Sequence, residues 1–453
     1  MSETMNSADQ NPTPEFRTIM GHPSPLWMLF MSEFWERFAF YGIRWALVLY
    51  IVAQFHGGDQ SGQASANLTY GSYLALVYAG AIFGGYIADK VIGYQRSILI
   101  GAVFMAAGLF MIMLPDPVLF RFGLATVIVG NGLFKPNIST MVGKLYSIAD
   151  ERRDSGFTIF YMGINMGAFI APIITGWLAT SVFGSDAAPA YQYVFGASGI
   201  GMLISLVWFY FGRRQLQGIG SPPADAPGRR RLVYVSIGAL FVIPLMYLLL
   251  TLGAEPLQYV LTALFIGLAA MLMIEGVRDG KVARDRTIAM LLIFVFNILF
   301  WMFYEQAGNS FTFLADQIVN RDLGGFIFPV AWFQSVPALA CIVLAPVLAW
   351  LRIWMAKRNV NPSIPRKFGL GLVFNGLAFL LLMFALTSLV SDAGKIPFWT
   401  MFAVYVIQVV GELCLSPIGL SMVTKLAPVR LVGLGMGGWF LSTGIGNNLS
   451  GIF

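Results

Sequence analysis

The stretch at residues 31–52, MSEFWERFAFYGIRWALVLYIV, sets ionisable side chains into an otherwise apolar segment. Glu33, Glu36 and Arg37 follow the spacing that places side chains on one face of a helix, and Arg44 continues that face. In lipid each charge would cost at least about 2.5–3.5 kcal/mol, so this face must contact protein or a wet cavity. A structural salt-bridge cluster would meet that requirement, and so would a path for ions or substrate.

Three further ionisable residues stand in apolar runs elsewhere in the chain. Lys135 lies in GNGLFKPN, Glu305 in FWMFYEQ and Glu412 in QVVGELCLSP. They come from both halves of the sequence, and a site shared between two helical bundles is typical of secondary transporters. The distribution therefore favours an ion or substrate path over a purely structural cluster.

The composition predicts a membrane protein. Hydrophobic residues make up 57% of the 453 residues and charged residues only 11%, whereas soluble domains carry about 25% charged residues. Apolar runs recur at the roughly 20-residue length that crosses a bilayer, without the short alternating segments of a β-barrel. We therefore expect an all-α polytopic membrane protein. The expected spans are residues 28–54, 68–88, 97–115, 118–142, 156–180, 191–212, 233–252, 257–277, 286–315, 325–352, 368–390, 397–424 and 432–453.

One linker, rich in Pro, Gly and Arg, divides these spans into groups. Six spans precede it, and a tight helical hairpin and five more spans follow it. The expected parts are a cytoplasmic N-terminal tail (1–27), a six-helix bundle (28–213), the linker with an inserted transmembrane hairpin (214–285), and a second bundle with five of six helices (286–453). Because the chain stops inside an apolar helix, we expect the natural sequence to continue with one more helix after Phe453.

The distribution of basic residues predicts the orientation in the membrane. Most of the 28 Lys and Arg residues fall in loops that face the cytoplasm if the N-terminus is cytoplasmic, which is the positive-inside bias. This bias accounts for the net charge of +6. Membrane lipid is therefore an expected partner, and nucleic acid is not.

Several motifs resemble those of one transporter family. EFWERFAFYG is similar to the E-x-x-E-R-F-x-Y-Y-G motif of the proton-dependent oligopeptide transporter family, within the major facilitator superfamily. The segments GGYIADKVIGYQR, GNGLFKPN, FYMGINMGAFIAP, FWMFYEQ, WFQS, GELCLSPIG and WFLS resemble the family's other signatures, in the same order. The resemblance implies a major facilitator fold, two six-helix bundles with an inserted hairpin. It also implies a monomeric symporter of protons with di- and tripeptides in a bacterial inner membrane, without cofactor or metal.

Proton coupling needs carboxylates that are neutral during part of the cycle. Burial raises the pKa of a carboxylic acid, and a neighbouring cation lowers it. Acids that are buried beside a cation are therefore candidates for proton coupling. With the resemblance, we assign proton coupling to Glu33, Glu36, Arg37 and Glu305. We also expect Glu305 to form a switchable ion pair with Lys135 across the two bundles.

A peptide presents a carboxylate, an ammonium group and variable side chains. Arg44 and Lys135 could bind the carboxylate, and Glu412 could bind the ammonium group with Asn165 as an amide partner. The following Ser416, before a proline, predicts a helix broken beside the site. Aromatic side chains could line the side-chain pockets, although packing accounts for them equally well. These are Tyr41, Tyr78, Tyr161, Trp301 and Trp439.

The sequence also departs from the family pattern. Pro337 stands where many members have an Asn that helps to hold the peptide amine, so Glu412 is expected to carry more of that recognition. Phe40 replaces a common Tyr and removes one hydroxyl group. No His falls in an expected span, so any proton route must use carboxylates.

Other classes of function fit less well. A proton-coupled transporter of nitrate or drug-like substrates, a passive facilitator or channel, and a peptide sensor without transport remain alternatives. The GASG segment at 196–199 is similar to the motif of intramembrane serine proteases, but that chemistry needs a base that the spans lack. Neither a zinc-protease motif nor an ATP-binding loop occurs, so we do not expect an enzyme.

Overall fold

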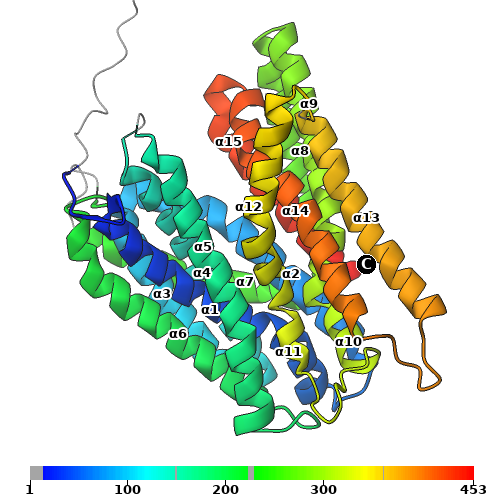
Figure 1. Cartoon of the computed structure of the whole chain (residues 1–453). Helices are drawn as coiled ribbons and strands as arrows, with labels where there is room; N and C mark the ends of the chain where they lie inside the picture. The colour runs from blue at the N-terminus through cyan, green and yellow to red at the C-terminus, as the bar shows by residue number, and fades with distance from the viewer. Residues whose placement is uncertain (1–13, 148–149, 223–228, 361) are drawn as a thin grey trace, which may run out of the picture.

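The computed structural model describes residues 14–147, 150–222, 229–360 and 362–453, and Figure 1 shows their arrangement. These residues are almost wholly helical, apart from the two-residue strands β1 (Thr18–Ile19) and β2 (His22–Pro23), which pair antiparallel before the first long helix. Eleven helices within the described residues are long and apolar enough to cross a membrane. The predicted all-α polytopic class is confirmed.

Six helices form the first group, and each of the first six expected spans falls on one of them. Gly93, with φ +81°, makes the turn between the second and third of these helices. Asp116 caps the start of the fourth, where its carboxylate accepts hydrogen bonds from the backbone N–H groups of Val118 and Leu119. The six are α1 (Ser24–Phe55), α2 (Gly62–Ile87), α3 (Tyr94–Ile112), α4 (Pro117–Lys144), α5 (Arg152–Trp177) and α6 (Tyr191–Gly212).

The remaining helices form the hairpin and the second group. The hairpin consists of α7 (Arg229–Leu252) and α8 (Ala254–Arg278). The second group consists of α9 (Lys281–Tyr304), α10 (Ser310–Gln317), α11 (Val330–Phe333), α12 (Val336–Lys357), α13 (Ile364–Ser388), α14 (Trp399–Leu426) and α15 (Val432–Ile452).

Two expected spans are not continuous helices. The span predicted at 286–315 divides into α9 and α10, separated by a 3₁₀ turn at Glu305–Gly308. The span predicted at 325–352 begins later, at Val330, and divides into α11 and α12. Hydropathy reports the apolar length of a segment but not where its backbone hydrogen bonds are interrupted.

The two helical groups approach each other at one side of the molecule and splay apart toward the other, where α1 begins (Figure 1). Within the described residues, the hydrogen bonds and ion pairs that join the groups lie away from the side where α1 begins. Ser335 donates to the Phe169 carbonyl (2.7 Å), the Trp332 indole donates to the Ile173 carbonyl (3.2 Å), and Arg321 forms a bidentate ion pair with Asp186 (2.8 and 3.0 Å). The structure is therefore closed on the side of α10 and α11.

The hairpin contacts both groups. Helix α7 packs on α4 and α2, whereas α8 packs on α15 and α9. The Asn448 side chain donates to the Ala254 carbonyl (2.8 Å) and to the Gln258 side chain (3.0 Å), which ties the start of α8 to α15. The hairpin thus spans the seam where α2 meets α15.

Close backbone contacts within the first group depend on glycine. A Cβ atom at Gly84 on α2 would overlap the carbonyl group of Gly132 on α4, whereas a Cβ at Gly80, one turn earlier, would meet Ile128 at an ordinary 3.6 Å. Gly84 is therefore a helix-packing residue.

We expect Gly84→Ala to force α2 and α4 apart and to lower stability by at least about 1–3 kcal/mol, the usual cost of overpacking. Gly80→Ala is the matched control, and it should be nearly neutral because its new methyl group has room. Thermal unfolding of both variants in detergent measures the difference. Equal melting temperatures for both variants would contradict this account of the contact.

Candidate functional site

The face of α1 that carries Glu33, Glu36 and Arg37 forms a buried cluster with α4. Arg37 pairs with Glu36, with NH2 2.5 Å from Oε1, and its Nε lies 3.5 Å from a Glu33 oxygen. Lys135 of α4 also pairs with Glu33, and the Asn131 amide donates to Glu36 (3.3 Å). Both carboxylate side chains are fully buried. Two acids and two cations therefore share one site within the first group.

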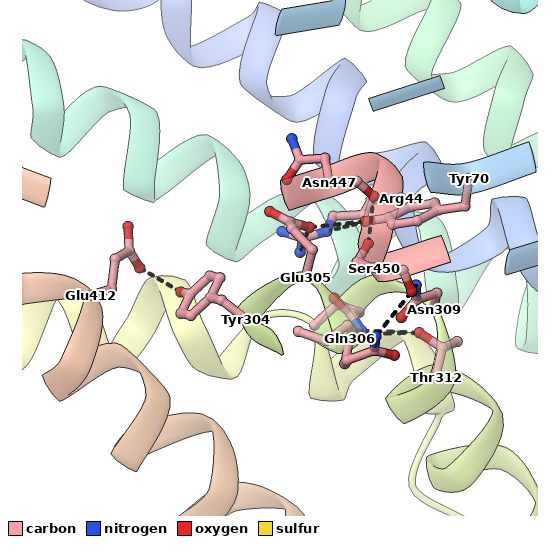
Figure 2. A network of polar contacts seen from close by, with 12 residues as sticks. Arg44, Tyr70, Tyr304, Glu305, Gln306, Asn309, Thr312, Glu412, Asn447 and Ser450 are labelled. Carbon is pink, nitrogen blue, oxygen red and sulfur yellow. Dashed lines mark hydrogen bonds and ion pairs between the residues drawn. The ribbon is translucent and has the colours of Figure 1, made fainter. Parts of the chain in front are cut away.

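A second buried ion pair joins the two helical groups. Arg44 of α1 lies 2.8 Å from a Glu305 oxygen, and its Nε donates to the Tyr70 hydroxyl of α2 (2.9 Å). The Tyr70 hydroxyl donates in turn to Glu305 at 3.4 Å. The charged side chains are only 11% and 7% exposed. Figure 2 shows the three side chains together, with Arg44 between Tyr70 and Glu305.

The interruption between α9 and α10 places Glu305 at this interface. Its 3₁₀ turn leaves backbone groups outside the regular helical pattern, and side-chain amides bond to the surrounding backbone. Gln334 donates to the Ala307 carbonyl, and Gln306 and Asn309 both donate to the Ser450 carbonyl of α15 (2.9 Å each). Figure 2 shows Gln306 and Asn309 below the ion pair.

Gly308 allows Arg44 and Tyr70 to reach the turn. A Cβ atom at this position would overlap the Tyr70 hydroxyl and would lie 2.9 Å from Arg44 Nε. Any side chain there would push one of the two partners away from Glu305. The ion pair therefore depends on a backbone approach that only glycine permits.

Glu412 lies apart from both clusters, on α14. Its carboxylate accepts a hydrogen bond from the hydroxyl of Tyr304, the residue that precedes Glu305 (Figure 2). The expected helix break beside Glu412 is wrong, because α14 is one helix from Trp399 to Leu426. Ser416 lies in this helix, but its side chain is outside the described residues.

The other predicted binding residues fall into two environments. Trp301 donates to the Asn297 side chain (3.1 Å) and stacks edge-on against Tyr304 at 5.4 Å, so it is fixed within the second group. Trp439 is buried against Phe294 and Phe368. Both tryptophans therefore make packing contacts within the second group.

On the first group, the Arg44 guanidinium lies 5.6 Å from the centre of the Tyr41 ring. Asn165 donates to the Tyr161 carbonyl of its own helix (3.0 Å), and Tyr161 is 41% exposed. Tyr78 is half-buried on α2. The exposed ring of Tyr161 is thus the most accessible of the predicted aromatic residues.

The expected ion pair between Lys135 and Glu305 is not present. Lys135 pairs with Glu33, and Glu305 pairs with Arg44. Both residues are charged and lie in apolar spans, but sequence spacing does not measure their heights relative to each other across two helices. Arg44, two helical turns beyond Arg37, reaches the interrupted end of α9 instead.

The polar partners that were not predicted include Tyr70, Asn131, Tyr304 and Gln334. Tyr304 and Gln334 lie inside the quoted motifs FWMFYEQ and WFQS, next to or within a turn of a residue that was singled out. Asn131 lies four residues before Lys135, which places both side chains on the same face of α4. A search for polar side chains at helical spacing from each buried charge would have found Asn131. Tyr304 and Gln334 could have been found only from their place in the quoted motifs, and Tyr70 has neither signal.

Buried charges at the interface of two helical groups in a multi-pass membrane protein define a transporter and not an enzyme. The comparisons with known proteins agree. The model of the POT family matches residues 95–453. The chain belongs to the POT family of transporters, and its predicted major facilitator fold is confirmed by the solved structures that it matches.

The chain is similar to several known proteins over almost its whole length. It is 37% identical to the peptide transporter YePEPT of Yersinia enterocolitica (97% of this chain and 89% of the relative) and 34% identical to the di-/tripeptide transporter of Lactococcus lactis (96% and 89%). Among solved structures, a peptide transporter POT in complex with sulfate matches with a TM-score of 0.83 at 34% identity (97% and 90%). A mutant of a peptide transporter POT in complex with alafosfalin gives 0.82 at 35% identity (96% and 89%).

We expect the two ion pairs to be energetically separate. Lys135→Ala and Glu33→Gln should each destabilise the protein by about 3–5 kcal/mol, the cost of breaking a buried pair, and the double variant should cost much less than their sum. Lys135→Ala combined with Glu305→Gln should instead add within about 0.3–0.5 kcal/mol, since the two residues share no partner.

Unfolding free energies of the single and double variants give both coupling energies. Arg44→Ala with Glu305→Gln is the positive control for coupling across the groups. A large coupling energy between Lys135 and Glu305 would contradict the observed pairing.

Proposed function

We propose that the chain is a proton-coupled symporter that imports di- and tripeptides across the bacterial inner membrane by alternating access. The Arg44–Glu305 ion pair carries this proposal, because it joins the two helical groups through a group that a proton can neutralise. The similarity to transporters named for peptides supports the choice of substrate.

The proposed orientation places the N-terminus in the cytoplasm and the closed side outside the cell. The positive-inside bias supports it. The moving parts are the first bundle (28–213) and the second bundle (286–453), with the linker and hairpin (214–285) between them. In this orientation the structure is an inward-facing state of a monomer.

Protonation of Glu305 would remove the negative charge that holds Arg44. A buried cation without its partner is costly, so the external contact would weaken and the bundles could separate there. The cluster of Glu33, Glu36, Arg37 and Lys135 would be a second place, inside the first bundle, where a proton binds and is released. Its two acids and two cations are balanced, so adding a proton to Glu33 would free Lys135.

The freed cation would bind the peptide carboxylate, and Glu412 would bind the ammonium group. Arg44 offers a planar donor fork and Lys135 a point charge for a carboxylate. Across the interface, the Glu412 carboxylate keeps acceptor capacity beyond the Tyr304 hydroxyl, since a carboxylate accepts at about four positions. Asn165, Tyr41, Tyr78, Tyr161, Trp301, Ser416 and Trp439 complete the proposed binding residues.

Uptake of labelled dialanine into proteoliposomes tests the function. Uptake above the external concentration is expected with an inward acid gradient and not without one, because proton entry down the gradient supplies about 1.4 kcal/mol per pH unit. Equal uptake with and without the gradient would indicate a passive facilitator. Binding without any uptake would indicate a sensor.

Glu33→Gln and Glu36→Gln test the coupling cluster. Each should abolish acid-driven accumulation of dialanine but retain exchange of peptide between compartments at equal pH, because exchange needs no net proton movement. Thr69→Ala, at an exposed hydroxyl outside the clusters, is the control. Wild-type accumulation by both Gln variants would move proton coupling to other residues.

Glu412→Gln tests the amine site. Wild type should prefer dialanine strongly over N-acetyl-dialanine, and the variant should lose most of that preference. A charge-assisted contact of about 1.5–3 kcal/mol predicts roughly ten- to hundred-fold weaker binding of the free amine. Tyr304→Phe removes the neighbouring hydroxyl but keeps the charge, so it should retain the preference. Equal discrimination by wild type and Glu412→Gln would place the amine elsewhere.

A further inference from the structure

A cavity of about 550 Å³ lies between the hairpin and the first helical group. Helices α2, α4, α7 and α8 all contribute to its wall. Every lining residue is glycine or an apolar residue, including Gly80, Ile128, Val235, Gly238 and Leu257. Polar ligands would find no hydrogen-bond partner among these side chains, so the wall selects a hydrocarbon.

The cavity is elongated along the helices. Its lining on α7 extends from Val235 to Leu249, which corresponds to about 21 Å of helix, and on α2 from Leu76 to Ile87, about 16 Å. One leaflet of a bilayer has a hydrocarbon thickness of about 15 Å, half of the full core. The cavity therefore has the length that an extended acyl chain occupies in one leaflet.

Basic residues lie at one end of the cavity. Ile87 on α2 is followed by Lys90, whose side chain is 64% exposed beside Asp89, and Val235 on α7 is preceded by Arg230 and Arg231. Clusters of Lys and Arg at a membrane surface attract anionic headgroups. The charge at this end complements a phosphate, and the wall beyond it complements an acyl chain.

We propose that the cavity binds one acyl chain of an anionic glycerophospholipid whose phosphate lies against Arg230 and Arg231. The chain fills the space between α7 and the first group, while α8 remains packed on α15 and α9. The bound lipid is thus a packing element of the hairpin. It fills the space beside the direct contacts of α7 with α4 and α2, such as the stacked rings of Phe122 and Tyr247.

Two glycines of the hairpin offer a matched test. A Cβ atom at Gly238 on α7 or at Gly267 on α8 would meet no atom within 4 Å, but only Gly238 lines the cavity. Gly238→Phe should fill the cavity, and Gly267→Phe should place the same ring on the other side of the hairpin. Both variants keep the full chain and leave the proposed transport residues unchanged.

The probe is phosphatidylglycerol with a photoreactive diazirine in one acyl chain, reconstituted with the purified protein in nanodiscs. In wild type, peptides covering 76–87 and 128–133 should carry more label than the exposed face of α13. Gly238→Phe should reduce that labelling at least about tenfold, because its ring takes the volume of the chain, and Gly267→Phe should not. Replacing Arg230 and Arg231 by Gln should remove the preference for phosphatidylglycerol over phosphatidylcholine with the same chains.

Uniform labelling of all lipid-facing helices in wild type would overturn the proposal, and this result needs no variant to fold. Unchanged labelling of 76–87 in a folded Gly238→Phe would overturn it as well. Equal labelling by the two lipids in wild type would overturn the assignment of an anionic headgroup.

Discussion

The ion pair between Arg44 and Glu305 is the interaction on which the arrangement of the two helical groups depends. It is nearly excluded from solvent, and it connects the first helix of one group to the interrupted helix of the other. Removing one partner of such a pair typically costs about 3–5 kcal/mol, because the remaining charge stays buried. One chemical event, the neutralisation of a carboxylate, can therefore decide whether the groups remain in contact on this side.

The ion pair exists because several weaker interactions hold an interrupted helix in place. Glu305 points to Arg44 only while the 3₁₀ turn after α9 persists, and side-chain amides from α10's cap, α11's end and the turn itself satisfy the backbone around it. Gly308 supplies the space for Arg44 and Tyr70 to approach. The electrostatic contact and the irregular backbone are thus one structural unit, because the turn positions Glu305 and Gly308 for the contact with Arg44 and Tyr70.

Much of the fold was predictable because its main signal is the length and polarity of apolar runs. Each expected span falls on helices of the structure, and the face of Glu33, Glu36 and Arg37 is buried as its spacing predicted. Two features were not predictable. The partner of a buried charge depends on heights and tilts of helices, so Lys135 was matched with Glu305 and not with Glu33. The break after Tyr304 and the continuity of α14 depend on tertiary hydrogen bonds. Neither hydropathy nor the presence of a single proline predicts these bonds.

Helix α15 combines contacts in three directions within its last two turns. Gly451 packs against the backbone of α2, the Ser450 carbonyl accepts bonds from the turn after α9, and Asn448 is bonded to the start of α8. A substitution in these turns would disturb three neighbours at once. Evolutionary adaptation of this transporter to new substrates therefore has little freedom in these last two turns.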